Sequence, residues 1–280
     1  MPDVVSPCLK FLLYIWDLGT KLQNHGVGFQ VRTARWTWDT REKTHFHIPG
    51  LLFADDLVLM ARNHNDLAGL LEVTTEYGNR NKLLFNPEKS AVVIYAPHEV
   101  GREKTLTIQG RTIPVAKNYK YLGITLSDSR NYLNEQEEAW AMWTNSALHA
   151  MHATSPWGFN RFETARVQWK ATAISKLTYA YSVLVRSANL RDTLDRARRK
   201  AGKWALGIPG SRVSNELVDS ELGRSSFEAR DAQSKLRYFE RKRSMSESRW
   251  PKATLRIMKL TKKKAKAYQE TVRLRAKYKC

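Results

Sequence analysis

Cysteine is nearly absent from this sequence, which contains only Cys8 and Cys280. Two cysteines cannot build a disulfide framework, and no set of cysteine and histidine residues has the spacing of a zinc finger. Because disulfides are absent, the composition suits a reducing compartment, and we expect an intracellular protein, nuclear or cytoplasmic.

Long hydrophobic runs are missing as well. The apolar stretch near the start, residues 9–18, is interrupted by Lys10 and Asp17 and is too short to span a bilayer. It also has no small-residue cleavage site of the secretory kind. The sequence therefore predicts neither a membrane anchor nor export.

Acidic residues are few, with 27 Asp and Glu against 47 Lys and Arg, a net charge of +20 and a pI near 10.0. Residues 186–280 hold 27 basic and 10 acidic residues, so +17 of this charge lies in the C-terminal third and +3 in residues 1–185. Such an excess favours a polyanionic partner, first of all nucleic acid. The hydrophobic content of 42% is ordinary for a folded protein. We expect a near-neutral module joined to a basic one that grips a phosphate backbone.

The most sharply defined stretch is residues 51–60, where two short apolar runs meet at adjacent carboxylates, Asp55 and Asp56. Each run suits a buried strand, so the stretch predicts a β-hairpin with Ala54, Asp55 and Asp56 at its tip. Two carboxylates 4 Å apart repel each other by roughly 4 kcal/mol at an effective dielectric of 20. A divalent cation removes this cost, and Mg²⁺ usually takes one or two carboxylates together with substrate phosphates. The pattern suggests phosphoryl transfer, although Asp is also common in solvated turns.

Further strand signals follow one helical pattern. Residues 91–95 and 119–126 predict strands, and residues 105–115 predict a hairpin between them. Gly123 marks either a bulge or a close backbone approach. Asn65 is expected to cap the intervening helix, whose apolar face comprises Leu67, Leu70, Leu71, Thr74 and Tyr77.

The order of three motifs resembles the palm of reverse transcriptases from non-LTR (LINE-type) retrotransposons. The motifs are Phe53-Ala54-Asp55-Asp56, Asn86-Pro87-Glu88-Lys89-Ser90 and Tyr121-Leu122-Gly123. A fourth, partial match begins at Ser6-Pro7, where proline at the first helical position predicts a helix over residues 7–23. In the family that segment lies beside the template and the incoming nucleotide.

The resemblance implies an RNA-directed DNA polymerase in which a primer 3′ hydroxyl attacks a dNTP, with two metal ions at the reacting oxygens. It implies that Asp55 binds Mg²⁺ and that Asp56 binds or supports it, with an RNA template and a DNA primer as partners. It places Lys89 near the incoming triphosphate and residues 121–123 at the primer end. On the residue alone, Lys89 suits an exposed turn equally well.

The chain departs from the family in its first part. Family palms carry another essential carboxylate on a strand well upstream of the Ser-Pro segment, whereas only five residues precede Ser6 here. Asp3 is too close, Asp17 belongs to the predicted helix and Asp39 lies in a connector. We therefore expect a truncated polymerase that lacks this strand and the fingers, has an unpaired sheet edge and is inactive alone.

From residue 131 onward the pattern is helical, over about 131–153, 161–185, 190–206, 226–245 and 252–278. In the third pattern an apolar stripe lies opposite four basic residues, Arg196, Arg199, Lys200 and Lys203. Charged faces are usually only solvated, but a run of one charge sign favours phosphate contact. Parts of residues 204–230 resemble the region that follows the palm in retrotransposon polyproteins, often described as the thumb.

These patterns predict an α+β chain with a partial polymerase palm, an antiparallel sheet with helices, followed by an all-helical basic region. The palm covers residues 1–127, a thumb-like domain covers 128–245, and a basic C-terminal helix or tail covers 246–280. The alternative function is a non-catalytic nucleic-acid-binding remnant that acts through the basic helices alone.

Overall fold

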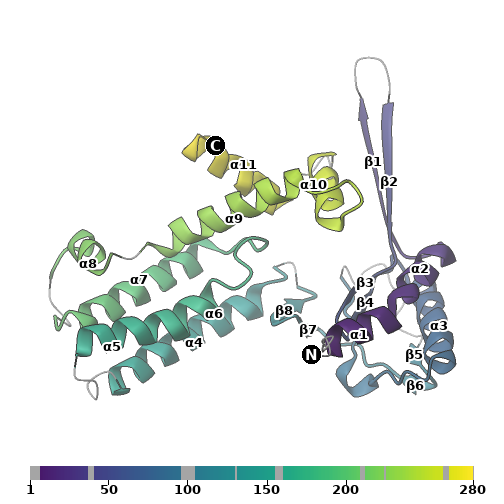
Figure 1. Ribbon diagram of the computed structural model, residues 1–280, viewed down its shortest axis with the longest axis horizontal. Helices are drawn as coiled ribbons and strands as arrows, with labels where there is room; N and C mark the ends of the chain where they lie inside the picture. Colours follow the sequence, from purple (N-terminus) through teal and green to yellow (C-terminus); the bar gives the residue numbers. More distant parts are fainter. Residues whose placement is uncertain are drawn as a thin grey trace, which may run out of the picture. The chain divides into compact units, whose positions relative to one another are not determined.

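The computed structural model describes residues 7–36, 41–95, 105–129, 131–154, 160–208, 212–223, 225–260 and 265–279. The chain divides into two compact units, residues 1–132 and 133–280. The first unit combines helices with antiparallel strands and the second is helical (Figure 1), which confirms the expected α+β class. No helix in the described ranges has the length and apolar character needed to cross a membrane.

The helices of the first unit differ in detail from those predicted. They are α1 (Pro7–Tyr14), α2 (Trp16–His25), α3 (His64–Arg80) and a 3-10 turn, η1 (Pro87–Lys89). The helix predicted over 7–23 is divided at Ile15, which lies outside both α1 and α2. The predicted cap of α3 was wrong, because Asn63 and not Asn65 accepts from the Asp66 amide, at 2.8 Å.

The strands of this unit form four separate antiparallel pairs. They are β1 (Phe29–Trp36) with β2 (Arg41–Ile48), β3 (Gly50–Phe53) with β4 (Asp56–Leu59), β5 (Thr107–Ile108) with β6 (Arg111–Thr112), and β7 (Asn118–Tyr121) with β8 (Ile124–Ser127). The hairpin predicted over 105–115 is confirmed. The strand predicted over 91–95 was wrong, because only Val92 forms a bridge, to Val115.

The strand predicted over 119–126 is instead two strands joined by a tight turn. Tyr121 pairs with Ile124, so the loop contains only Leu122 and Gly123. Both have left-handed backbone, with φ of 47° and 79°, as a type I′ hairpin turn requires. Gly123 is therefore a turn glycine, neither of the two roles that the sequence suggested.

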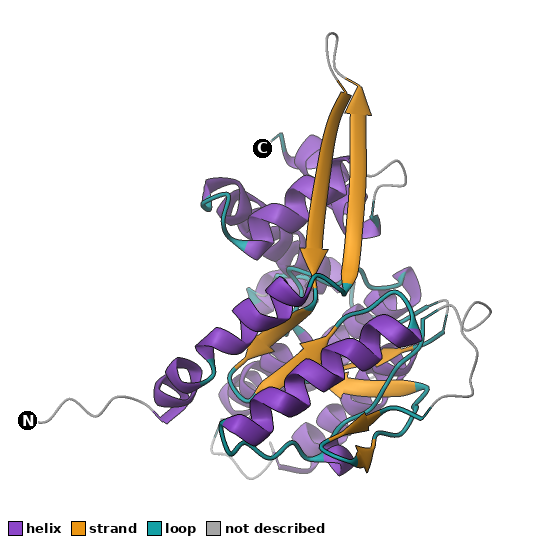
Figure 2. Ribbon diagram, turned by 90° about the vertical axis from the view of Figure 1, so that its right-hand side faces the viewer, coloured by secondary structure: helices purple, strands orange, loops and turns teal. Residues whose placement is uncertain are grey.

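Helices α2 and α3 pack against the β3–β4 hairpin and against each other. Figure 2 shows two helices lying side by side across short strands of this unit. Their shared core contains Leu18, Leu22, Leu70 and Tyr77, with Leu52, Leu57 and Leu59 of the hairpin packed against it. The predicted apolar face of α3 is confirmed, since Leu70, Leu71, Thr74 and Tyr77 are buried.

The second unit is a set of packed helices. They are α4 (Asn134–Thr154), α5 (Arg161–Gln168), a π-helical segment (Trp169–Ile174), α6 (Ser175–Leu177), α7 (Ala188–Ala205), α8 (Asn215–Leu222), α9 (Phe227–Ser244), α10 (Trp250–Leu260) and α11 (Lys266–Tyr278). The pattern predicted over 161–185 ends as a helix at Leu177, and the pattern over 252–278 corresponds to two helices. Helix α8 was not predicted. Helix α7 packs against α4, α5, α8 and α9 through its buried apolar stripe.

Candidate functional site

The adjacent carboxylates lie at the end of a short hairpin. Phe53 pairs with Asp56, so the turn contains only Ala54 and Asp55. Ala54 has a left-handed φ of 51°. We predicted Asp56 in the turn, but it is the first residue of β4, because a two-residue turn suits the twist of paired strands.

The hairpin has one packed face and one open face. Leu52 and Leu57, which pair with each other, contribute to the core beneath α2 and α3. Phe53 is 59% exposed, and the side chains of Asp55 and Asp56 are exposed as well. Among the described residues neither carboxylate has a hydrogen bond or an ion pair. The packed face thus fixes the backbone that presents two unpaired carboxylates to solvent.

This donor set suits a hard cation. Carboxylate oxygens are the protein ligands that Mg²⁺ prefers, and one or two carboxylates are its usual protein complement. In the described part of the chain, no group of three or more His, Cys, Asp or Glu side chains could hold a metal ion. Asp55 and Asp56 therefore fit half of a metal site and leave the remaining positions to other ligands.

The β7–β8 hairpin brings Tyr121 into the electrostatic range of Asp56. Burial raises the pKa of the Tyr121 phenol, and the negative charge of Asp56 raises it further. Tyr121 and Asp56 come from strands more than sixty residues apart in the sequence, so the fold joins the first and third motifs. Leu122 and Gly123 form the turn of the same hairpin.

The second motif forms a capped turn. The Asn86 side chain accepts from the Glu88 amide at 3.0 Å, and the Ser90 hydroxyl donates to the Asn86 carbonyl at 2.8 Å. These bonds shape η1, in which Lys89 is exposed. The Tyr119 hydroxyl donates to the Lys89 carbonyl, so strand β7 holds this turn.

Two residues that position this region were missed in the sequence. Tyr119 binds the Lys89 turn, and Gln109 holds the segment before it, because its side chain accepts from the Phe85 amide at 3.0 Å and donates to the Leu83 carbonyl at 2.7 Å. Gln109 itself sits in the β5–β6 turn with φ of 47°. Only the neighbouring Gly110 gave a sequence signal, and it indicated a turn rather than a contact.

The first motif segment is described only in part. Ser6 lies outside the described residues, and Pro7 is the first residue of α1. Farther along, Asp17 of α2 accepts from the Tyr77 hydroxyl of α3. Burial and this carboxylate raise the pKa of Tyr77 well above its usual range. Asp17 therefore has a structural partner.

The four predicted basic residues lie on α7 in the second unit. Arg196 and Lys200 are exposed, while Arg199 and Lys203 are partly buried. Arg196 folds back on its own helix, where its Nε donates to the Asp192 carbonyl at 3.3 Å. The four residues therefore lie on one helix but differ in their exposure to solvent.

Arg198 interrupts the basic run of α7. Its side chain is 3% exposed and forms ion pairs with Asp219 at 2.6 Å and Asp195 at 3.1 Å. These carboxylates raise the pKa of Arg198 against the opposing effect of burial. Arg198 thus joins α7 to α8, and its charge is satisfied within the unit.

Neither a protein-family model nor a solved structure gives a significant match to the chain. A curated relative is the "Retrovirus-related Pol polyprotein from type-1 retrotransposable element R2" of Popillia japonica, 32% identical over 134 residues. The match covers 45% of this chain and 20% of the relative, so it spans about a fifth of the relative's length. The chain is therefore similar to part of a retrotransposon Pol polyprotein.

Proposed function

We propose that the chain is part of an RNA-directed DNA polymerase of the non-LTR retrotransposon kind, with Asp55 and Asp56 as metal-binding carboxylates. The observation that carries the proposal is the pair of exposed, unpaired carboxylates on a hairpin whose other face is packed. Such a hairpin holds two negative charges at a fixed place without neutralising them. The similarity to a retrotransposon polyprotein supports the choice of nucleotidyl transfer.

Each residue of the site has a defined task in this proposal. Bound Mg²⁺ would supply Lewis-acid stabilisation of the reacting oxygens. Asp55 and Asp56 hold the cation, and the exposed Lys89 binds the triphosphate, with its turn held by Tyr119. Burial and the charge of Asp56 move the pKa of Tyr121 still farther above neutral pH, so its protonated phenol adds no negative charge beside Asp56 and the primer end.

The proposal is tested with Asp55→Asn in a longer version of the protein that carries an upstream palm segment. We expect primer extension on an RNA template to fall at least a thousandfold, while nucleic-acid affinity changes less than twofold. Glu76→Gln is the matched control, because Glu76 is an exposed acid of the same unit without a partner among the described residues. Equal extension rates in Asp55→Asn and the parent protein would refute a catalytic role for this hairpin.

The template and primer also need a backbone-binding surface, and we assign part of it to Arg196, Arg199, Lys200 and Lys203. Each neutralised phosphate contributes roughly −0.7 to −0.9 to the slope of log K against log salt. Changing all four residues to Gln should weaken binding to unrelated RNA and DNA alike and flatten this slope. Gln has a helix propensity close to that of Lys and Arg, so circular dichroism should be unchanged. An unchanged slope would show that this face is only solvated.

A further inference from the structure

The positive charge of the chain is most concentrated from the last turn of α9 to the C-terminus. Residues 241–280 contain 15 Lys and Arg against two acids, Glu247 and Glu270. Helix α10 contains no acidic residue, and α11 contains only Glu270. What these helices present to a partner therefore depends on where those two acids point.

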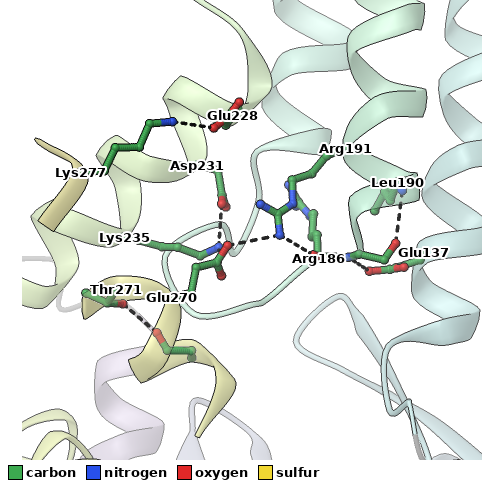
Figure 3. A network of polar contacts seen from close by, with 12 residues as sticks. Glu137, Arg186, Leu190, Arg191, Glu228, Asp231, Lys235, Glu270, Thr271 and Lys277 are labelled. Carbon is green, nitrogen blue, oxygen red and sulfur yellow. Dashed lines mark hydrogen bonds and ion pairs between the residues drawn. The ribbon is translucent and has the colours of Figure 1, made fainter. Parts of the chain in front are cut away.

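Glu270 points into the unit. Its Oε2 accepts from the Lys235 ammonium at 2.8 Å, and its Oε1 pairs with Arg191 at 3.3 Å. Lys235, which is 2% exposed, also pairs with Asp231 at 2.6 Å (Figure 3). Glu247 is the other acid, and it pairs with Lys252 at 3.5 Å.

We call this internal network, formed by Arg191, Asp231, Lys235 and Glu270, the clasp. It links α7, α9 and α11, since Arg191 belongs to α7 and Glu270 to α11. Asp231 is buried and its Oδ1 has no hydrogen-bond partner among the described residues. The clasp fixes the rotation of α11 about its axis, because a buried ammonium has to keep its carboxylate partners.

The rotation set by the clasp decides which residues of α11 face outward. Thr271, next to Glu270, is buried against the unit, whereas Lys266 and Arg273 are exposed. On α10, Arg256 and Lys259 are three residues apart, so they share one helix face, and both are exposed. None of these four cations has an ion-pair partner in the described ranges.

We infer that the exposed cations of α10 and α11, Arg256, Lys259, Lys266 and Arg273, form a surface that binds the phosphodiester backbone of nucleic acid. Four unpaired cations on two helices whose one acid, Glu270, is held by Lys235 and Arg191 suit a polyanion of repeating charge. The inference does not require the polymerase activity proposed above. It also places backbone contact on helices other than α7.

A nucleic acid fits this surface better than an anionic membrane does. A helix that lies in a membrane interface inserts its apolar face into the lipid. In α10, however, Leu255 is 3% exposed and Ile257 and Met258 are partly buried, so the apolar side is already packed in the protein. Trp250 of α10 and Val272 and Tyr278 of α11 remain exposed. Val272 and Tyr278 lie six residues apart and so do not share a helix face, which leaves no continuous apolar side on α11 to insert into lipid.

The first test removes charge from this surface in the full chain, with Arg256→Gln, Lys259→Gln and Arg273→Gln combined. A matched control removes three exposed cations from another part of the same unit, with Arg161→Gln, Arg166→Gln and Lys170→Gln. Affinities for single-stranded RNA, single-stranded DNA and duplex DNA are measured from 50 to 300 mM salt. We expect the slope of log K against log salt to fall by roughly 2 to 3 in the first variant and by less than 1 in the control.

The second test separates an oriented surface from diffuse charge. Glu270→Gln raises the net charge of the chain by one, so attraction by charge alone predicts tighter binding. If the clasp orients α11, the same substitution weakens binding three- to tenfold, with circular dichroism showing that the helices persist. Tighter binding by Glu270→Gln would refute the orientation by the clasp.

The surface itself would be refuted by an unchanged salt slope in the triple variant or by an equal loss in the control. Vesicles containing phosphatidylserine serve as the other polyanion. Equal or tighter binding to these vesicles than to nucleic acid would also overturn the inference. A failed Asp55→Asn test would leave it untouched, because that substitution lies in the other unit.

Discussion

The stability of the fold depends strongly on amino-acid type at residues with left-handed backbone. Gly123 has φ of 79° in the β7–β8 turn, a conformation that costs a residue with a Cβ about 1–2 kcal/mol. Gly19, by contrast, lies inside α2, where an added Cβ would meet Leu52 at 3.9 Å, an ordinary contact distance. Two identical substitutions should therefore act in opposite directions.

We predict that Gly123→Ala destabilises the first unit by about 1 kcal/mol, because alanine resists the left-handed turn. Gly19→Ala should stabilise it by about 0.5–1 kcal/mol, because alanine favours a helix interior over glycine. Urea unfolding, followed by a probe in the first unit, measures both. Destabilisation of the same size in the two variants would mean that the turn geometry does not set the cost.

At the scale of single residues, the sequence indicated the acidic residues of the candidate site but not the residues that hold the turns around it. Asp55 and Asp56 were conspicuous because two apolar runs flank them. Tyr119 was not, since its role depends on the carbonyl of Lys89, thirty residues earlier. Arg198 was not among the residues that we assigned to the basic face of α7, but its ion pair with Asp219 could not be predicted, because Asp219 lies on a helix that was not predicted.

Among the helices, the clasp makes α9 the element on which the packing of α11 depends. Lys235 holds two carboxylates, from Asp231 and Glu270, in a place where its own side chain is 2% exposed. Burial raises the pKa of Asp231 despite the nearby ammonium. Removing the cation would leave both acids without their main partner.

We predict that Lys235→Met lowers the free energy of unfolding of the second unit by about 3–5 kcal/mol, the usual cost of breaking a buried ion pair. Lys242→Met on the same helix is the control, because Lys242 lies over the Tyr238 ring at 4.5 Å without an acidic partner among the described residues. Chemical denaturation measures both variants. A loss for Lys235→Met as small as that for the control would show that water satisfies the clasp.

The contact between α4 and α7 should respond to pH. The His152 and Trp204 rings lie with their centroids 4.4 Å apart. Burial and the neighbouring His149 lower the pKa of His152. The folded state therefore binds this proton less readily than the unfolded chain, so the stability that His152 contributes is present above pH 6.5 and declines below it.

We predict that the unfolding free energy of the parent protein falls between pH 7.5 and pH 5.5 by more than that of His152→Phe. The substitution keeps an aromatic ring against Trp204 and removes the titrating group. Denaturation at both pH values in one buffer system gives the two differences. Equal pH dependence in both proteins would show that His152 does not contribute to it.

Helix positions were predicted more accurately than helix ends. The 3.6-residue periodicity located the helices over 134–154, 188–205 and 227–244 within about three residues. It showed neither the break between α1 and α2 at Ile15 nor the end of α6 at Leu177, because the apolar pattern continues across both places. The prediction of one strand over 119–126 was wrong for another reason. Leu122 adopts a left-handed conformation in the turn, and leucine is not a residue type that indicates such a conformation.

Across the whole molecule, the chain separates a near-neutral unit with the carboxylates from a helical unit with most of the charge. The strand signals end near residue 127 in the sequence, and the two compact units divide between residues 132 and 133. The excess of positive charge was located only from residue 186 onward. Composition could not show how many of the cations are paired inside the second unit.

We predict that the chain of 280 residues shows no templated synthesis with Mg²⁺ but does bind nucleic acid. No third carboxylate joins Asp55 and Asp56 among the described residues, and a metal pair is sensitive to ligand number. Primer extension on RNA, with binding measured in the same buffer, checks both parts. Incorporation of dNTP that disappears in Asp55→Asn would contradict the prediction.

The open face of the β3–β4 hairpin has a practical consequence for handling the protein. Leu51 is 37% and Phe53 59% exposed, and in the described ranges the two strands pair only with each other. Unpaired strand edges beside exposed apolar side chains promote association between copies. During purification we expect oligomers that grow with protein concentration and persist in high salt, where the repulsion between positively charged copies is screened.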